Sequence, residues 1–267
     1  MSGFFTAIVE AVYAFFGIID PFCGPVGIFK LFAGNTLLAC GDAGWGDEVA
    51  FGFVVTGTLA VATLPVGLVM GFFIALAKQS EEKSLRLAAN IYTTLFRGLP
   101  ELLTLFIVYY GLQILVQNFM TAVGYGGTVE INAFVAGMVA LGVVFSAYCS
   151  EVLLSAFKAI PRGQYEAGYA LGLHHGRTMQ LIVLPQLIRV ALPGLGNLWM
   201  ALLKDTALVS VIGLPDILRQ TGVAARVTKQ AFEFYAIACL LFLILAFLSS
   251  LVFSSIESWA KRSEAAR

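Results

Sequence analysis

The sequence contains little charge. Only 12% of its 267 residues are Asp, Glu, Lys or Arg, whereas 59% are hydrophobic. Soluble globular domains carry about 25% charged and about 45–50% apolar residues. The composition therefore excludes an ordinary soluble domain and predicts an integral membrane protein. The formal net charge is zero, which also excludes the basic face that nucleic-acid binding requires.

Features of several other protein classes are missing as well. The first ten residues hold no Lys or Arg, so no signal peptide is predicted. The four cysteines show no C-x-x-C spacing, and no G-x-x-x-x-G-K-[ST] loop is present, so neither a metal nor a cofactor is expected in this chain. The polar segments are about 30 residues at most, too short for an independent domain. The chain is therefore not expected to be an enzyme.

Long apolar segments dominate instead. A helix that spans the bilayer needs about 20 predominantly apolar residues. The second predicted span is expected to begin early, near Ile91, and the fourth is interrupted by Pro193 and two glycines. Phe4–Ile19 is a sixth candidate, either a short span or an interfacial helix. The five predicted spans are Phe51–Ala77, Leu102–Met120, Ile131–Ser150, Val190–Leu203 and Phe234–Ile256.

Basic residues are distributed unequally between the segments that join these spans. Cytoplasmic loops carry an excess of Lys and Arg, so the asymmetry predicts a cytoplasmic C-terminus and an outward-facing N-terminal flank. Residues 1–50 are expected to be an N-terminal extension, 51–258 the transmembrane domain, and 259–267 a cytoplasmic tail. The basic residues after the first, third and fifth spans are Lys78, Lys83, Arg86, Lys158, Arg162, Arg177, Arg189, Lys261, Arg262 and Arg267. The opposite loops contain Arg219, Arg226 and Lys229.

The cysteines fall into two groups. Cys23 and Cys40 lie in the outward-facing flank on this topology, where disulfides form. A bond between them is one hypothesis, and two free thiols are the alternative. Cys149 and Cys239 lie inside apolar spans and are expected to be small buried hydrophobic residues.

A polar segment, residues 161–185, follows the third span. Gln164–Leu171 is predicted to be helical, and Gly172 is expected to end that helix in the left-handed conformation. His174–Leu184 is expected to form a second helix, which Pro185 ends or kinks. The two adjacent histidines of the chain begin this second helix. Neighbouring helical positions face different directions, so the pair is a poor metal site and is expected to be solvent-exposed.

This polar segment resembles the cytoplasmic signature of permease subunits of bacterial binding-protein-dependent ABC importers, which is E-A-A, three residues, G, nine residues, I-x-L-P. The resemblance implies that the segment is the coupling helix, which docks into a cleft of a cytosolic ATPase subunit. An acid at the signature's first position can pair with an arginine of that partner. One residue departs from the signature, because Gly168 replaces its second alanine. The matching residues are Glu166, Ala167, Gly168, Gly172, Ile182, Leu184 and Pro185.

Two further segments, Phe96–Leu112 and Lys204–Gln220, resemble permeases for histidine, lysine, arginine and glutamine, with R-G-x-P-x-x-x-x-L-F and K-x-T-x-L-x-x-x-I patterns. The sequence of these segments most resembles that of the Q-type subunits of histidine and opine (octopine or nopaline) systems. The resemblance covers 52–258 and implies an all-α, five-helix, MetI-like importer-permease core in the bacterial inner membrane.

The resemblance also implies partners: a homologous second permease that forms a heterodimer with this chain, two cytosolic ATPase subunits that use ATP and Mg, and a periplasmic solute-binding protein. The cargo would be a polar or basic amino acid or an opine, imported by alternating access. Leu208–Leu218 is expected to be a short outer helix.

Ionisable residues inside a bilayer are costly and are candidates for a substrate pathway. Glu101 is expected either to contact a cationic substrate or the partner subunit, or to pair with Arg97 four residues earlier. Glu151 is expected to cap the end of the third span. The Pro- and Gly-rich fourth span is expected to break and expose backbone groups to a polar solute, with an ordinary interfacial helix end as the alternative. Its candidate pathway residues are Asn197, Lys204, Asp205 and Thr206.

Two other functions are compatible with these patterns. An ion-coupled secondary transporter would need buried carboxylates near the middle of several spans. A membrane scaffold without transport activity would not need the polar segment to dock on a partner.

Overall fold

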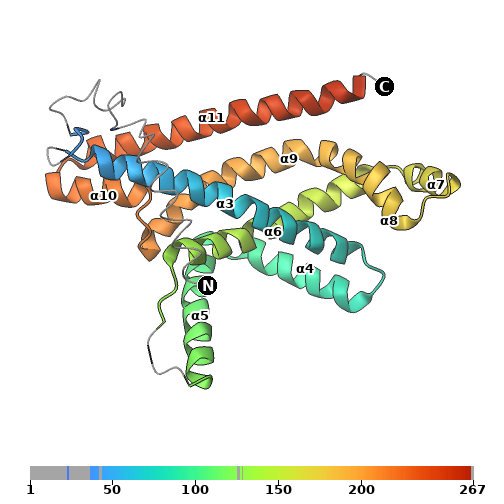
Figure 1. Ribbon diagram of the computed structural model, residues 1–267, viewed down its shortest axis with the longest axis horizontal. Helices are drawn as coiled ribbons and strands as arrows, with labels where there is room; N and C mark the ends of the chain where they lie inside the picture. The colour runs from blue at the N-terminus through green and yellow to red at the C-terminus, as the bar shows by residue number, and fades with distance from the viewer. Residues whose placement is uncertain (1–22, 24–36, 42–43, 125–126, 128, 266–267) are drawn as a thin grey trace. The chain divides into compact units, whose positions relative to one another are not determined.

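The computed structural model describes residues 23, 37–41, 44–124, 127 and 129–265, and these form helices and turns without a strand (Figure 1). The prediction of an all-α protein with five spans is confirmed. The sixth candidate, Phe4–Ile19, lies outside the described residues. Within the described chain, the helices long and apolar enough to cross a membrane are Gly46–Gln79, Glu101–Ala122, Ala133–Ala159, His175–Ile212 and Ala231–Ser258.

The chain divides into two compact units, residues 1–55 with 215–241 and residues 56–214 with 242–267. In the second unit α6 (Ala133–Ala159) is the central helix. It packs against α4 (Lys83–Gly98), α5 (Glu101–Ala122) and α9 (Leu184–Asp205). Of the candidate spans, α6 has the largest buried share, 61% of its most apolar window. The other candidate spans leave most of their apolar surface available to lipid or to partner chains.

Small residues allow α3 (Gly46–Gln79) to approach α6 closely. A Cβ atom on Gly67 would lie 2.5 Å from the ring of Phe145, and one on Gly71 would lie 2.8 Å from Cβ and Sγ of Cys149. Association of helices in a bilayer depends on such close van der Waals packing. The glycines of α3 therefore set the distance between these two helices.

The second span begins later than the sequence predicted. No helix runs through from Ile91, because α4 ends at Gly98 and α5 begins at Glu101. Pro100 has no N–H to donate and disfavours helical backbone at the residue before it. Leu99 accordingly adopts an extended conformation, with ψ at 144°. The break separates a short helix with several exposed charged positions from the apolar span.

The expectation that the fourth span is broken is wrong. Helix α9 continues through Pro193 to Asp205. The glycines nearby have a packing role, since a Cβ on Gly194 would lie 2.7 Å from Val152 and one on Gly196 would lie 3.2 Å from Phe253. Neighbouring helices can compensate for the backbone hydrogen bond that proline removes. The Pro-Gly pattern therefore indicates close helix contact within a continuous helix.

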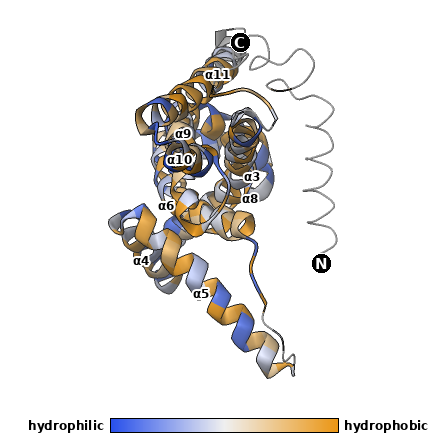
Figure 2. Ribbon diagram, turned by 90° about the vertical axis from the view of Figure 1, so that its left-hand side faces the viewer, coloured by the Kyte–Doolittle hydropathy of each residue, from blue (hydrophilic) through white to orange (hydrophobic). Residues whose placement is uncertain are grey.

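Two glutamines on α5 hold the segment that leads to α6. The side-chain amide of Gln113 donates to the carbonyl of Val129 and accepts from the N–H of Ile131, the latter across 2.9 Å. Gln117 donates to the carbonyl of Gly127 (3.0 Å) and accepts from the N–H of Val129 (2.9 Å). Figure 2 shows such polar positions as blue patches on the otherwise apolar α5. The two amides satisfy backbone groups that an apolar surface would leave unpaired.

The short outer helix also differs from its prediction. Leu208–Leu218 is not one helix: the 3-10 helix η2 (Thr206–Ile212) ends at Gly213, and α10 (Ile217–Thr228) begins after Asp216. In the first unit, α10 contributes Ala224 and Ala225 to a small core with Phe234 of α11 (Ala231–Ala265), and Leu37 and Trp45 pack against that core.

Candidate functional site

The polar segment forms α7 (Arg162–Ala170) followed by a tight turn. Gly172 has φ of +75°, so its predicted left-handed conformation is confirmed. Its N–H donates to the carbonyl of Tyr169 (2.9 Å), and the N–H of Leu173 donates to the carbonyl of Gly168 (3.1 Å). These bonds satisfy the last carbonyls of the helix and end it abruptly.

The second helix of this segment is less regular than expected. It consists of the four-residue α8 (His175–Thr178) and the π-helix η1 (Met179–Val183), and α9 follows directly. Pro185 lies directly after η1, in the first turn of α9. A π-helix occurs mostly as a single turn and is frequent at functional sites.

The signature residues divide between two faces. Glu166, Ala167 and Pro185 are exposed, whereas Gly168 is buried against α8. Ile182 and Leu184 are half-buried. The exposed acid therefore stands on the outer face of α7, and the residue that departs from the signature lies on the inner face.

Two side-chain contacts join α7 to the helices that follow it. Nε2 of Gln186 in α9 donates to Oε1 of Gln164 across 3.0 Å. The hydroxyl of Tyr169 lies 2.8 Å from Nδ1 of His175, and the two rings stack with their centroids 6.4 Å apart. His175 is thus exposed, as expected, but it is bonded to α7. Burial, with a smaller contribution from nearby Tyr169, raises the pKa of Tyr165 on the same helix.

A cavity of about 260 Å³ lies between α5, α6 and α9, close to the lower end of ligand pockets at about 300 Å³. Two of the predicted pathway residues, Glu101 and Asp205, both line it. The hydroxyl-bearing Tyr148 contributes a third polar side chain, and the rest of the wall is apolar: Leu141, Val144, Phe145, Leu198, Ala201 and Leu202. Two acids in an apolar wall can hold a cationic group, since a buried charge requires an opposite partner.

The other pathway candidates do not line this cavity. Asn197 and Lys204 are exposed on α9. Thr206 is fully buried, and its hydroxyl donates to the carbonyl of Leu203 across 2.7 Å. Trp199, which also lies on α9, packs against Phe253 of α11 with ring centroids 6.1 Å apart. The structure therefore brings together only Glu101 and Asp205 of the predicted set.

An ion-pair cluster that the sequence did not reveal lies on three helices. Lys78 of α3 and Arg97 of α4 both contact Oε1 of Glu151 on α6, Arg97 at 3.1 Å. The guanidinium of Arg97 also lies 5.5 Å above the ring of Tyr148. Arg97 thus contacts Glu151 where Glu101 was considered as its partner, and Glu151 is more than an interfacial cap.

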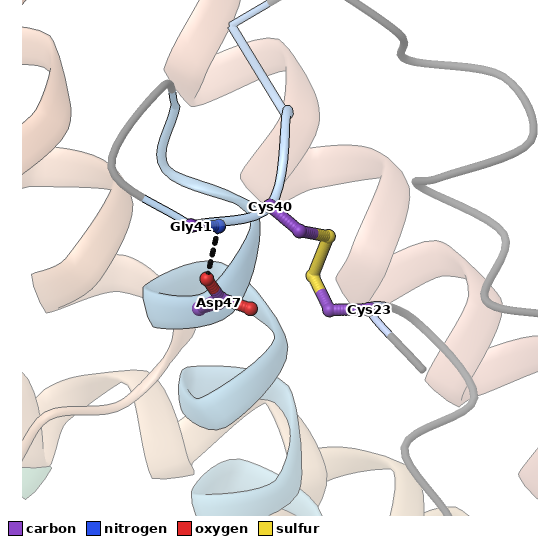
Figure 3. Close-up of a disulfide and its surroundings, with 4 residues drawn as sticks. All are labelled: Cys23, Cys40, Gly41 and Asp47. Carbon is purple, nitrogen blue, oxygen red and sulfur yellow. Dashed lines mark hydrogen bonds between the residues drawn. A yellow bond between two sulfur atoms is a disulfide. The ribbon is translucent and has the colours of Figure 1, made fainter. Parts of the chain in front are cut away.

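Cys23 and Cys40 form a disulfide, with their Cα atoms 5.7 Å apart (Figure 3). Asp47 accepts a hydrogen bond from the N–H of Gly41 beside it. The carboxylate of Asp47 lies within 4.8 Å of both sulfurs, but the bonded sulfurs are not available as metal ligands. Of the other two cysteines, Cys149 is buried as predicted, whereas Cys239 is exposed.

Asp216 begins α10 as its N-terminal cap. Its Oδ1 accepts from the N–H of Arg219 across 2.9 Å, and among the described residues its buried Oδ2 has no hydrogen-bond partner. Burial raises the pKa of this carboxyl from 3.8 to about 6, against the lowering effect of the backbone N–H of Arg219.

The helical spans, the turn that carries the signature and the cavity between the spans define a membrane permease component. Residues 67–262 match the family of binding-protein-dependent transport system inner membrane components, and the chain belongs to this family. The sequence resemblance to importer permeases is thereby confirmed.

Individual relatives agree with this family. The nopaline transport system permease protein NocQ of Agrobacterium fabrum is 42% identical over 85% of this chain and 97% of its own length. The histidine/lysine/arginine/ornithine transport system permease protein HisQ of Salmonella typhimurium is 36% identical over 80% of this chain and 93% of its own. Both relatives are permease subunits, as the sequence resemblance implied.

Solved structures show the same fold. An amino acid ABC transporter crystallised with histidines superposes with a TM-score of 0.67, at 34% identity over 80% of this chain and 94% of that one. The inward-facing methionine ABC transporter superposes with a TM-score of 0.61 at 15% identity, over 81% of this chain and 95% of that one. The five-helix importer-permease core is therefore confirmed.

Proposed function

We propose that this permease imports a polar or cationic amino acid, or an opine, driven by separate cytosolic ATPase subunits. A homologous second permease forms a heterodimer with it, and a periplasmic solute-binding protein delivers the cargo. The ATPases use ATP and Mg, and this chain needs no cofactor of its own. Relatives that carry nopaline, octopine, histidine and arginine in their names support this cargo class.

The observation that carries the proposal is the geometry of the coupling segment. Glu166 and Ala167 stand exposed on α7, where a partner can reach them, while Gly172 ends the helix in a tight turn. Through α8 and η1, α7 continues into α9, which lines the cavity. We place this segment on the cytoplasmic side, together with the C-terminus and residues 259–267, and the 1–50 extension on the opposite side of domain 51–258.

Substrate recognition is proposed for the cavity. The carboxylates of Glu101 and Asp205 attract a cationic group, and Tyr148 offers a hydroxyl. The apolar remainder of the wall strengthens these electrostatic interactions by excluding water. Asn197, Lys204 and Thr206 are proposed to lie along the pathway outside the cavity.

The experiment is co-purification of the whole complex and its reconstitution into vesicles. Basic amino acids and opines are tested for stimulation of ATP hydrolysis and for uptake. Glu166→Lys or Gly172→Pro is expected to abolish ATP-driven uptake while the protein still inserts, and the exposed Glu81→Lys serves as the control. Uptake driven by an ion gradient without ATP, or full activity of both variants, would contradict the proposal.

The cavity is tested with Glu101→Gln and Asp205→Asn. Both are expected to raise the half-saturating concentration of arginine by about tenfold or more, because each loss of a charge-assisted hydrogen bond costs about 1.5–3 kcal/mol. Uptake of a neutral substrate such as glutamine should change less. Equal effects on arginine and glutamine would contradict the assigned site.

A further inference from the structure

The residue that departs from the coupling signature, Gly168, makes an unusually close contact. A Cβ atom at this position would lie 2.5 Å from Cγ2 and 2.7 Å from Oγ1 of Thr178, and 3.1 Å from Cδ1 of Ile182. Carbon atoms in van der Waals contact lie about 3.5–4.0 Å apart. Helices α7 and α8 are therefore closer together than an alanine at position 168 allows.

Thr178 cannot move aside easily. It is fully buried, and a β-branched side chain has few alternative rotamers in a helix. Its hydroxyl also lies 3.4 Å from the carbonyl of Leu173 in the turn between the helices. By contrast, a Cβ on Gly163, in the first turn of the same α7, would meet no atom within 4 Å. The need for glycine is therefore specific to position 168.

The two hydrogen bonds that join α7 to the following helices lie on either side of this contact. Gln164 is one turn before Gly168 and is bonded to Gln186, and Tyr169 is the next residue and is bonded to His175. Together the three contacts fix α7 at a defined angle to the start of α9. At its other end α9 carries Asp205 into the cavity wall.

We propose that Gly168 and Thr178 form a size-matched positioning pair that sets the angle of α7 to α9. The pair makes a displacement of the docking helix α7 move α9 as one body, and so links ATP use to the cavity. The inference rests on the proposed coupling function of this segment. It predicts that alanine at 168, although it matches the family signature, is incompatible with threonine at 178.

The test compares Gly168→Ala, Thr178→Ala and the double variant in the reconstituted complex, with ATP-driven arginine uptake and ATP hydrolysis measured in parallel. Gly168→Ala is expected to lower the amount of arginine imported per ATP hydrolysed by about tenfold, because α9 no longer follows α7 as one body. The double variant, which lacks both colliding atoms of Thr178, is expected to recover most of that ratio. Gly111→Ala in α5, where an added Cβ meets nothing within 4 Å, is the control.

An unchanged ratio in Gly168→Ala overturns the proposal, and so does an equal loss in the double variant, because the defect then does not come from Thr178. If Gly168→Ala fails to assemble with the ATPase, recovery of assembly in the double variant supports the pair and continued failure overturns it. Glu166→Lys leaves this contact intact and tests docking separately. Unchanged uptake in Glu166→Lys contradicts the proposed function, whereas an unchanged ratio in Gly168→Ala alone contradicts only the pair.

Discussion

Nη1 of Arg97 lies 3.1 Å from Oε1 of Glu151, on a helix more than fifty residues further along the chain. The same carboxylate oxygen contacts Lys78, whose side chain is only 5% exposed. One acid thus serves two cations, and it ties α3, α4 and α6 together. The two cations depend on Glu151 to different degrees, because the side chain of Arg97 is 44% exposed whereas that of Lys78 is buried.

Glu151→Gln is expected to destabilise the folded protein by about 3 kcal/mol, because a buried Lys78 then lacks its counter-ion. Arg97→Gln is expected to cost no more than about 1 kcal/mol, as for other exposed ion pairs. Thermal unfolding of the detergent-solubilised protein measures both, with the exposed Lys83→Gln as the control. Equal melting temperatures for Glu151→Gln and Arg97→Gln would show that Lys78 does not depend on this acid.

The disulfide predicts a specific thiol count. Two thiols, those of Cys149 and Cys239, should react in the denatured, unreduced protein, and four after reduction. Four reactive thiols before reduction would show that the bond is absent.

Loss of the same bond should also be visible in stability. A double substitution of Cys23 and Cys40 by serine is expected to lower the stability of the folded chain by about 3 kcal/mol, the typical effect of a bridge across a loop of this length. The exposed, unbonded Cys239→Ser is the matched control. A melting temperature unchanged in the double variant contradicts a stabilising role.

The pKa of Asp216 is raised to about 6 from 3.8, the ordinary value of an Asp carboxyl. This difference predicts a pH dependence of stability. The folded state favours the protonated form, so this contribution is fully present below about pH 4 and is lost as the pH rises through 6. Between pH 4 and pH 8 the free energy of unfolding is expected to fall by about 2 kcal/mol from this group. Asp216→Asn keeps a capping oxygen and should remove that part of the pH dependence. An identical pH profile for wild type and variant would contradict the assignment.

The close approach of α3 to α6 predicts a difference between two glycines on α3. Gly71→Ala places a methyl group 2.8 Å from Cys149, and overpacking of this kind costs about 1–3 kcal/mol. Gly57→Ala meets nothing within 4 Å and should be neutral or slightly stabilising, because alanine favours helix. Thermal unfolding compares the melting temperatures of the two variants. Equal destabilisation would show that the loss of stability in Gly71→Ala does not come from its contact with α6.

Local patterns predicted the parts of this protein that depend on local chemistry. Length and apolarity located the five spans, and the spacing from Glu166 to Pro185 located the turn at Gly172, because turn and span formation involve neighbouring residues. The contact of Arg97 with Glu151 could not be predicted, since it depends on how α4 and α6 pack. The same reason explains the wrong prediction at Pro193: a Pro-Gly pattern is consistent with either a broken helix or a close contact, and only the neighbours Val152 and Phe253 decide between them.

The π-helix at Met179–Val183 holds one residue more than the α-helical turn that it replaces. Because the wide turn absorbs this residue locally, deleting one residue within η1 is expected to restore ordinary α-helix and to leave the faces of α9 nearly unchanged, with Gln186 still facing Gln164. Each residue of an α-helix advances the chain by about 100° around the axis. The same deletion in the middle of α9, where no wide turn absorbs it, would rotate the following residues by that angle and carry Asp205 out of the cavity wall.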